Sequence, residues 1–333
     1  MSSGELLSIF KAAACVFASV AVLVRLPRVV QQGRPDFVWV GTALAAVAFS
    51  ANGVMVPDRT VDAWLGGDNA FHLVRNLLAL SAMWCLRAAL VQSLQRTAWS
   101  RVRTLGEAAV GVALLSALTI AFWEIDRGPT SGSFIPDHLD QGATLVYTLL
   151  IMVMGGWNAA DVARVAFREL TVRQSGRDRL LWPALLGLGA GGALLVAGCA
   201  LEAVYAVLDH LGTWEPVGEA MRSSFGPVFL PGAALVCLTV AWLGLYAQGQ
   251  RLKVGVRMDL LRIAPVWERV GAERWGTGDP PPGWRSALSA NPQRVLYSSV
   301  IAIEDTLRAD EVTLPRDQRR ALVAAERRFE LTP

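Results

Sequence analysis

The sequence predicts an all-α, polytopic membrane protein with seven transmembrane helices and a small helical C-terminal tail. Two observations carry this prediction. Hydrophobic residues make up 53% of the 333 residues and charged residues only 18%, against about 25% in ordinary soluble domains. The charges are also unevenly placed, because long apolar runs alternate with short arginine-rich stretches up to about Gln250 and charges are frequent beyond it. We therefore expect a transmembrane domain at 1–249 and a cytoplasmic helical domain at 250–333.

The apolar runs set the expected spans, because a helix that crosses a bilayer needs about 20 largely apolar residues. No run after Gln250 meets this length. The seven expected spans are Leu6–Val24, Phe37–Val56, Phe71–Gln92, Glu107–Phe122, Gly142–Val162, Leu181–Tyr205 and Gly226–Gln248.

The charges of the connecting loops predict the orientation, because lysine and arginine concentrate in cytoplasmic loops. Every second loop carries several basic residues. The alternate loops hold only Arg59, Arg127 and Arg222 as basic residues, and they are rich in aspartate and glutamate. This pattern predicts a protein of the cell (plasma) membrane with its N-terminus outside and its C-terminus in the cytoplasm.

A polar stripe is expected at the outer end of the third span. Asn69, His72, Arg75 and Asn76 recur at i, i+3 and i+4, so they share one helix face. Glu202 in the sixth span is expected at the same depth. The five residues are our candidate for an outward-facing pocket. The alternative is that Arg75 reaches the outer surface as a snorkelling side chain and that the stripe is structural.

Arg87 is harder to explain, because it lies well inside the inner end of the third span and side chains tilt toward the helix N-terminus. An ionisable residue within a span is costly and needs a partner. Asn158 and Asp161 of the fifth span are expected at a similar depth, and Glu107 opens the fourth span on that side. We predict a buried pair between Arg87 and one of these residues, either to fix helix register or to line a solute path.

Two glycines of the sixth span, Gly187 and Gly191, form a GxxxG pattern that lets helices approach closely. We expect this face to contact another helix of the same chain. The alternative is that it forms the interface of a homodimer. The four cysteines lie in apolar runs and are interpreted as small buried side chains. We expect no cofactor, no metal site and no catalytic arrangement. The net charge of +3 gives no case for nucleic-acid binding.

The tail is expected to contain amphipathic helices. A first short helix around Met258–Val270 is predicted to break at Pro265. A second carries Leu296, Val300, Ile303 and Leu307 on one face, and a third carries Leu322, Ala325 and Phe329. Helices this short must bury these faces, either against each other, against the inner loops, in a second copy or on a cytosolic partner protein.

Three stretches of this chain, Val61–Leu80, Met258–Val270 and Arg294–Leu307, together resemble actinobacterial multi-pass membrane proteins of unknown function. Members of that group are often labelled as candidate transporters and end in a cytoplasmic domain of unknown function. The resemblance implies a seven-helix membrane protein. It supplies no catalytic or binding residues.

Two functions follow as hypotheses. A membrane sensor or signalling protein would combine an extracytoplasmic polar patch with a tail that binds a cytosolic partner. A small-solute transporter would instead use the intramembrane arginine and glutamate residues. Against transport, the chain shows no internal repeat and no paired broken helices, which many transporter folds contain.

Overall fold

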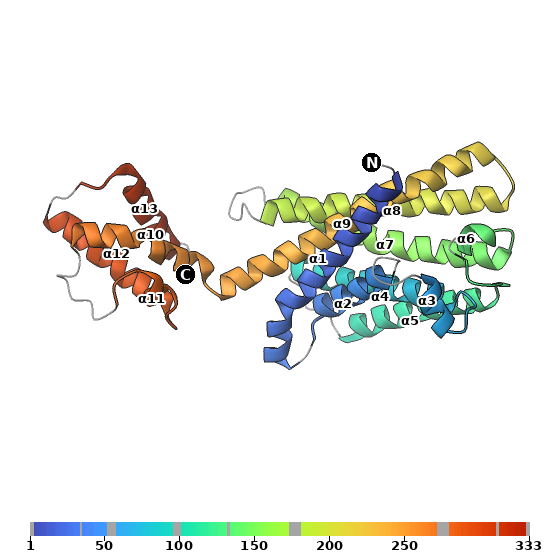
Figure 1. The fold of residues 1–333 in the computed structure, drawn as a ribbon, viewed down its shortest axis with the longest axis horizontal. Coiled ribbons are helices and arrows are strands. Elements are labelled where there is room, and N and C mark those ends of the chain that lie inside the picture. The colour runs from blue at the N-terminus through green and yellow to red at the C-terminus, as the bar shows by residue number, and fades with distance from the viewer. Residues whose placement is uncertain are drawn as a thin grey trace. The chain divides into compact units, whose positions relative to one another are not determined.

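The computed structural model describes residues 3–33, 35–51, 58–95, 101–131, 134–172, 181–271, 280–310 and 313–330. Within these ranges every regular element is a helix (Figure 1). The chain divides into two compact units, Met1–Leu245 and Tyr246–Pro333, which we call the membrane unit and the tail unit. The boundary falls inside the last long helix, a few residues before the expected one at 249.

The membrane unit is built from long apolar helices joined by short segments. Its elements are α1 (Ser3–Gln32), α2 (Phe37–Phe49), α3 (Asp58–Trp64), α4 (Ala70–Gln95), α5 (Arg101–Trp123), α6 (Phe134–Asp137), α7 (Gly142–Val172), α8 (Leu181–His210) and α9 (Glu215–Arg251). Six of them, α1, α4, α5, α7, α8 and α9, are long and apolar enough to cross a membrane. The chain is therefore an integral membrane protein with multiple spans.

The expected second span, Phe37–Val56, is described only in part. Its α-helical portion, α2, has 13 residues, which is about 20 Å of helix at 1.5 Å per residue, and residues 50 and 51 continue it as a π turn. Asp36 starts α2 by accepting a hydrogen bond from the Trp39 backbone at 2.8 Å. Residues 52–57 lie outside the described ranges. Within the described residues there are thus six candidate spans and one shorter apolar helix.

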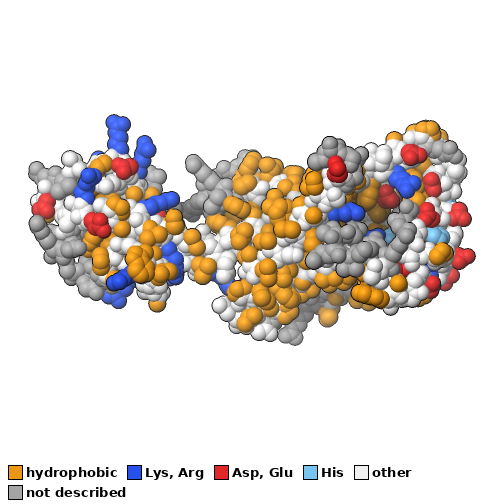
Figure 2. Space-filling model, in the orientation of Figure 1, with side chains coloured by type: hydrophobic (Ala, Val, Ile, Leu, Met, Phe, Trp, Pro, Cys, Tyr) orange, Lys and Arg blue, Asp and Glu red, His pale blue; other side chains and the backbone are white. Residues whose placement is uncertain are grey.

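The membrane unit is held together around α7, which packs against α4, α5 and α8, while α2 packs against α1 and α4. Small residues permit the closest approaches. A Cβ atom on Gly192 of α8 would lie 2.9 Å from the Ala159 carbonyl oxygen of α7, closer than real Cβ contacts allow. Figure 2 shows apolar side chains over much of the visible face of this unit, with acidic side chains at the end that carries α6.

The last span is longer than expected, because α9 begins at Glu215 and continues through Pro227 and Pro231. Pro231 therefore lies within this helix and does not mark its start. Proline removes one backbone donor per site, but the buried residues Ala233, Val236 and Val240 hold the following turns against α8.

The tail unit contains the end of α9 followed by α10 (Val254–Val270), α11 (Trp284–Ala287), α12 (Pro292–Ala309) and α13 (Arg316–Glu330). The expected faces of α12 and α13 are buried: Leu296 and Ile303 are fully covered, and Val300, Leu322 and Ala325 lie in the same core. The Phe329 side chain lies outside the described side chains. These helices therefore bury their apolar faces mainly against one another and against α10.

The predicted break at Pro265 is wrong, since α10 runs through it to Val270. Val266, Trp267 and Val270 follow the proline and are buried in the tail core. Burial of these three side chains outweighs the one backbone hydrogen bond that proline removes.

Candidate functional site

Arg87 forms the centre of a buried ionic cluster on three helices. Its Nε donates to Asp161 Oδ2 of α7 at 2.7 Å, and its Nη1 donates to Glu107 Oε2 of α5, also at 2.7 Å. The Arg87 residue is only 4% exposed. Two carboxylates at this distance supply the charge-assisted hydrogen bonds that a buried guanidinium requires. We call Arg87, Glu107 and Asp161, with the tryptophans described next, the Arg87 cluster.

Two tryptophans complete this cluster. The guanidinium carbon of Arg87 lies 5.3 Å from the ring centroid of Trp84 and 5.0 Å from that of Trp157. The two rings meet edge to face, at 5.7 Å. Aromatic faces attract cations, and more strongly where water is excluded. Arg87 is therefore enclosed by acids and aromatic rings, and the role of the two tryptophans was not predicted from the sequence.

Of the two residues of the fifth span expected beside Arg87, only Asp161 bonds to it. Asn158 is 1% exposed, and its Nδ2 donates instead to the Met154 carbonyl oxygen one turn back, at 2.7 Å. Asp161 also accepts from Arg164 at 3.0 Å. The two acids of the cluster are thus matched by Arg87 inside it and by the exposed Arg164 beside it.

The side chains of the polar stripe at the N-terminal end of α4 contact neighbouring helices. Asn76 donates to the Tyr147 hydroxyl of α7 at 2.9 Å. Arg75 Nη2 lies 2.9 Å from His72 Nδ1. Because arginine has no acceptor, this imidazole nitrogen must accept. The His72 ring packs against Phe134 of α6 in a tilted arrangement, with the ring centroids 5.0 Å apart. The stripe thus fixes α4 against α6 and α7.

Asp62 organises the loops beside this stripe, a role that the sequence alone did not indicate. It is 1% exposed and accepts backbone hydrogen bonds from Asn69 at 3.0 Å and Phe71 at 2.8 Å. Thr130 donates to the same carboxylate. Asn69 adopts a left-handed conformation with φ of 59° and donates to the Arg127 carbonyl oxygen at 2.9 Å. The sequence feature that could have indicated this role is the position of Asp62 shortly before the start of a helix, where aspartate side chains often accept hydrogen bonds from backbone N–H groups.

Glu202 does not join the stripe. It lies on α8, 8% exposed, and the positive charge acting on it is Arg222 of α9. Among the ion pairs of the described ranges, none connects Glu202 with Arg75. Arg222 also lies over the Tyr205 ring at 5.8 Å, at the edge of a depression of about 260 Å³ beside the α8–α9 connection. The expected outward-facing pocket is thus divided into two separate groups of residues.

The Gly187 and Gly191 face of α8 is covered by α9 of the same chain. A Cβ atom on Gly191 would lie 2.9 Å from Val236 Cγ2, and one on Gly187 would lie 2.5 Å from Thr239 Oγ1. The close approach is therefore intramolecular. This corrects the alternative of a homodimer seam at this face, because a second copy would find it occupied.

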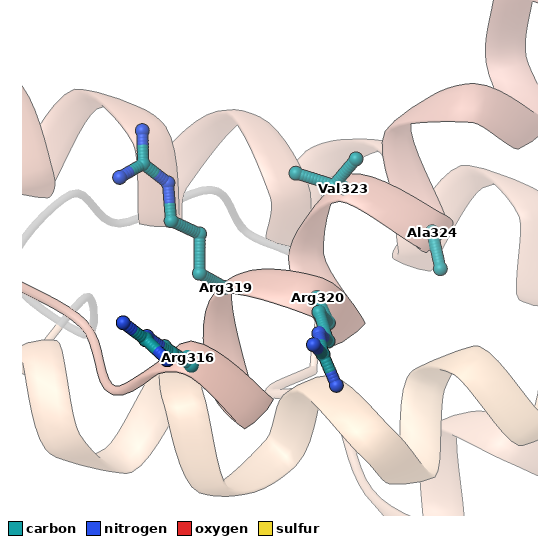
Figure 3. A pocket seen from close by; sticks show the side chains of 5 residues that line it. All are labelled: Arg316, Arg319, Arg320, Val323 and Ala324. Carbon is teal, nitrogen blue, oxygen red and sulfur yellow. The ribbon is translucent and has the colours of Figure 1, made fainter.

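In the tail unit, an open depression of about 580 Å³ lies along α13. It is lined by Arg316, Arg319 and Arg320 together with Val323 and Ala324. Figure 3 shows the three arginine side chains leaving the helix in different directions. All three are exposed. A cationic surface with an apolar floor fits an acidic partner.

Among the residues that the structure describes, no group of three or more His, Cys, Asp or Glu side chains could hold a metal ion. Glu107 and Asp161 both bond to the Arg87 guanidinium rather than facing an open site.

Comparisons with known proteins add no relative: no family model, no curated protein and no solved structure matches this chain. The resemblance to actinobacterial membrane proteins therefore stays a prediction from sequence.

Proposed function

We propose that the chain is a membrane sensor or signalling protein whose tail unit is the output module, with the N-terminus outside the cell and the tail in the cytoplasm. One observation carries the proposal. The helices that follow the last span fold on one another and have a core of their own. A folded module attached directly to a spanning helix is suited to pass a change in the membrane to a soluble protein.

The partner surface of this module is the α13 depression. Arg316, Arg319 and Arg320 are exposed, whereas Leu322 and Ala325 on the opposite side are buried in the tail core. The same helix therefore anchors itself with one face and presents cations with the other. The complementary ligand is an acidic surface on a cytosolic protein.

Photo-crosslinking in cells tests this proposal. A photoreactive side chain in place of Val323 in the full-length protein should capture one acidic protein, and the double variant Arg319→Glu and Arg320→Glu should lose that product. Arg308→Ala is the matched control, because Arg308 is exposed and pairs with Glu304 on α12. The proposal would be refuted if Arg308→Ala lost the crosslinked product while the α13 double variant kept it, or if all three proteins captured it equally.

Solute transport is a second candidate, favoured by buried polar atoms on α7. Thr144 Oγ1, Thr148 Oγ1 and Asn158 Oδ1 are all buried without a hydrogen-bond partner in the described ranges. Glu202 lies on the neighbouring α8. Such groups could solvate a small polar solute. Transport predicts that Glu202→Ala abolishes uptake into proteoliposomes, whereas the α13 variants leave it unchanged.

The Arg87 cluster supports the first candidate more than the second. Its donors and acceptors are engaged with one another at 2.7 Å, so a solute would have to displace two ion pairs. We assign this cluster the task of fixing α4, α5 and α7 to each other. No catalytic role is part of the proposal.

A further inference from the structure

The first helix of the tail unit, α10, has two apolar faces, and only one of them is buried. Val256, Leu260, Ile263 and Val266 lie in the tail core. On the other side Val254, Met258 and Leu261 are 44%, 45% and 42% exposed, and Pro265 is exposed as well. With about 100° per residue, these four exposed side chains fall within about 60° of arc. We call them the α10 stripe.

Basic side chains border this stripe. Arg257 and Arg262 fall on either side of it along the helix, and Arg251 and Lys253 precede it. The only acid between 251 and 265 is Asp259, which is 1% exposed. Figure 2 shows apolar side chains gathered on the visible face of the tail unit, with basic and some acidic ones around them. An apolar stripe between cations is typical of a helix that lies in a membrane surface.

The covalent chain keeps this stripe near lipid. The spanning helix α9 ends at Arg251, and α10 begins at Val254. Three residues extend over at most about 10 Å, so α10 begins within this distance of the end of the helix that contains the last span. Lys253 has a left-handed backbone, with φ of 52° and ψ of 37°, which turns the chain sharply between the two helices.

A second apolar group is held beside this turn. Arg257 Nε donates to the Leu252 carbonyl oxygen at 2.8 Å, and its Nη1 donates to the Ala287 carbonyl oxygen of α11 at 2.7 Å. Arg257 thereby ties the end of α11 to the α9–α10 turn. Leu288, which follows directly, is 70% exposed, and Trp284 is 64% exposed. Tryptophan favours the membrane–water interface.

We propose that the tail unit docks on the surface of the bilayer through the α10 stripe together with Trp284 and Leu288, and that anionic lipid headgroups bind the basic residues at its border. This docking face is distinct from the arginines of α13, so the inference does not depend on the signalling proposal. It leaves the α13 depression on another helix for a soluble partner.

Spin labelling of the full-length protein in lipid nanodiscs tests the docking. Labels are attached to Met258→Cys and, as a control, to Asp317→Cys on α13, in a background with the four native cysteines replaced by alanine. In nanodiscs of phosphatidylcholine and phosphatidylglycerol, the label at 258 should collide with oxygen severalfold more, relative to a water-soluble nickel chelate, than the label at 317. Equal ratios at the two positions would overturn the proposal.

Further measurements show whether lipid or protein covers the α10 stripe. Leu261→Asp should lower the oxygen-to-nickel ratio at 258, and Arg319→Asp should leave it unchanged. In phosphatidylcholine alone the ratio should fall, whereas an unchanged ratio would overturn the role of anionic headgroups. A label at 258 that is shielded from both reagents would show coverage by protein, either a second copy or a partner, and would also overturn the proposal.

Discussion

The membrane unit and the tail unit are both helical, but they hold their helices together by different means. In the membrane unit, glycine and alanine bring backbones into contact, and charged groups such as Arg87 are satisfied inside the bundle. In the tail unit, large apolar side chains such as Leu296 and Ile303 fill the core, and apart from the buried Asp259 the charges lie mostly outside it. Water drives apolar side chains together only in the second case. In lipid, packing and polar contacts must bind the helices.

The largest expected effect in this comparison comes from Arg87→Leu. The change leaves Glu107 and Asp161 without the cation between them, and breaking a buried pair in this way costs about 3–5 kcal/mol. We expect a marked loss of folded protein, measured as the fraction that survives heating in detergent. Arg164→Leu is the control, because that side chain is 69% exposed. Similar losses in both variants would contradict the assignment.

The counterpart in the tail unit is Leu296→Ala. Leu296 is fully buried among α10, α12 and α13, and truncating such a leucine costs about 2–5 kcal/mol. We expect proteolysis of the full-length protein to remove the tail unit much faster while the membrane unit survives. Leu288→Ala should change little in detergent, since Leu288 is 70% exposed. Loss of both units together would show that they do not fold separately.

A smaller effect is expected where helices touch through glycine. Gly192→Val places a branched side chain where a Cβ atom already lies 2.9 Å from the Ala159 carbonyl oxygen. Overpacking of this kind costs about 1–3 kcal/mol. The melting temperature in detergent should fall. Gly106→Ala on α5 should not lower it, because nothing lies within 4 Å of a Cβ atom there.

The smallest effect is expected for a surface ion pair of the tail unit. Arg308 contacts Glu304 at 3.3 Å with a side chain that is 78% exposed, and exposed pairs one turn apart contribute about 0.3–0.5 kcal/mol. Arg308→Ala should therefore leave resistance to proteolysis almost unchanged. If Arg308→Ala destabilised the protein as much as Arg87→Leu does, the exposure of an ion pair would not determine how much that pair contributes to stability.

The sequence predicted best where one physical pattern dominates. Periodicity placed Leu296, Val300 and Ile303 on the buried face of α12, because burial follows the helical repeat. Comparing the depths of residues along the spans predicted that Arg87 and Asp161 lie close together, because a buried guanidinium needs a carboxylate. These expectations required only local spacing and the cost of burying a charge.

The sequence failed where distant segments decide. Pro265 indicated a break, but the core contacts of Val266 and Trp267 keep α10 continuous. Asp62 looked like an ordinary loop acid until the fold brought Asn69, Phe71 and Thr130 to its carboxylate. Glu202 was also expected beside Arg75 because the two residues lie at a similar depth, but the positive charge near Glu202 is Arg222 of the following helix.

The Arg87 cluster also has a consequence for the order in which the chain is made. Glu107 follows Arg87 by 20 residues, whereas Asp161 follows it by 74. Since synthesis runs from the N-terminus, α4 and α5 emerge together and can bring the first carboxylate to the guanidinium before α7 exists. An isolated arginine at the centre of a span costs about 2.5–3.5 kcal/mol on insertion. Entry of α4 and α5 as a hairpin would lower that cost and leave α7 to complete the cluster.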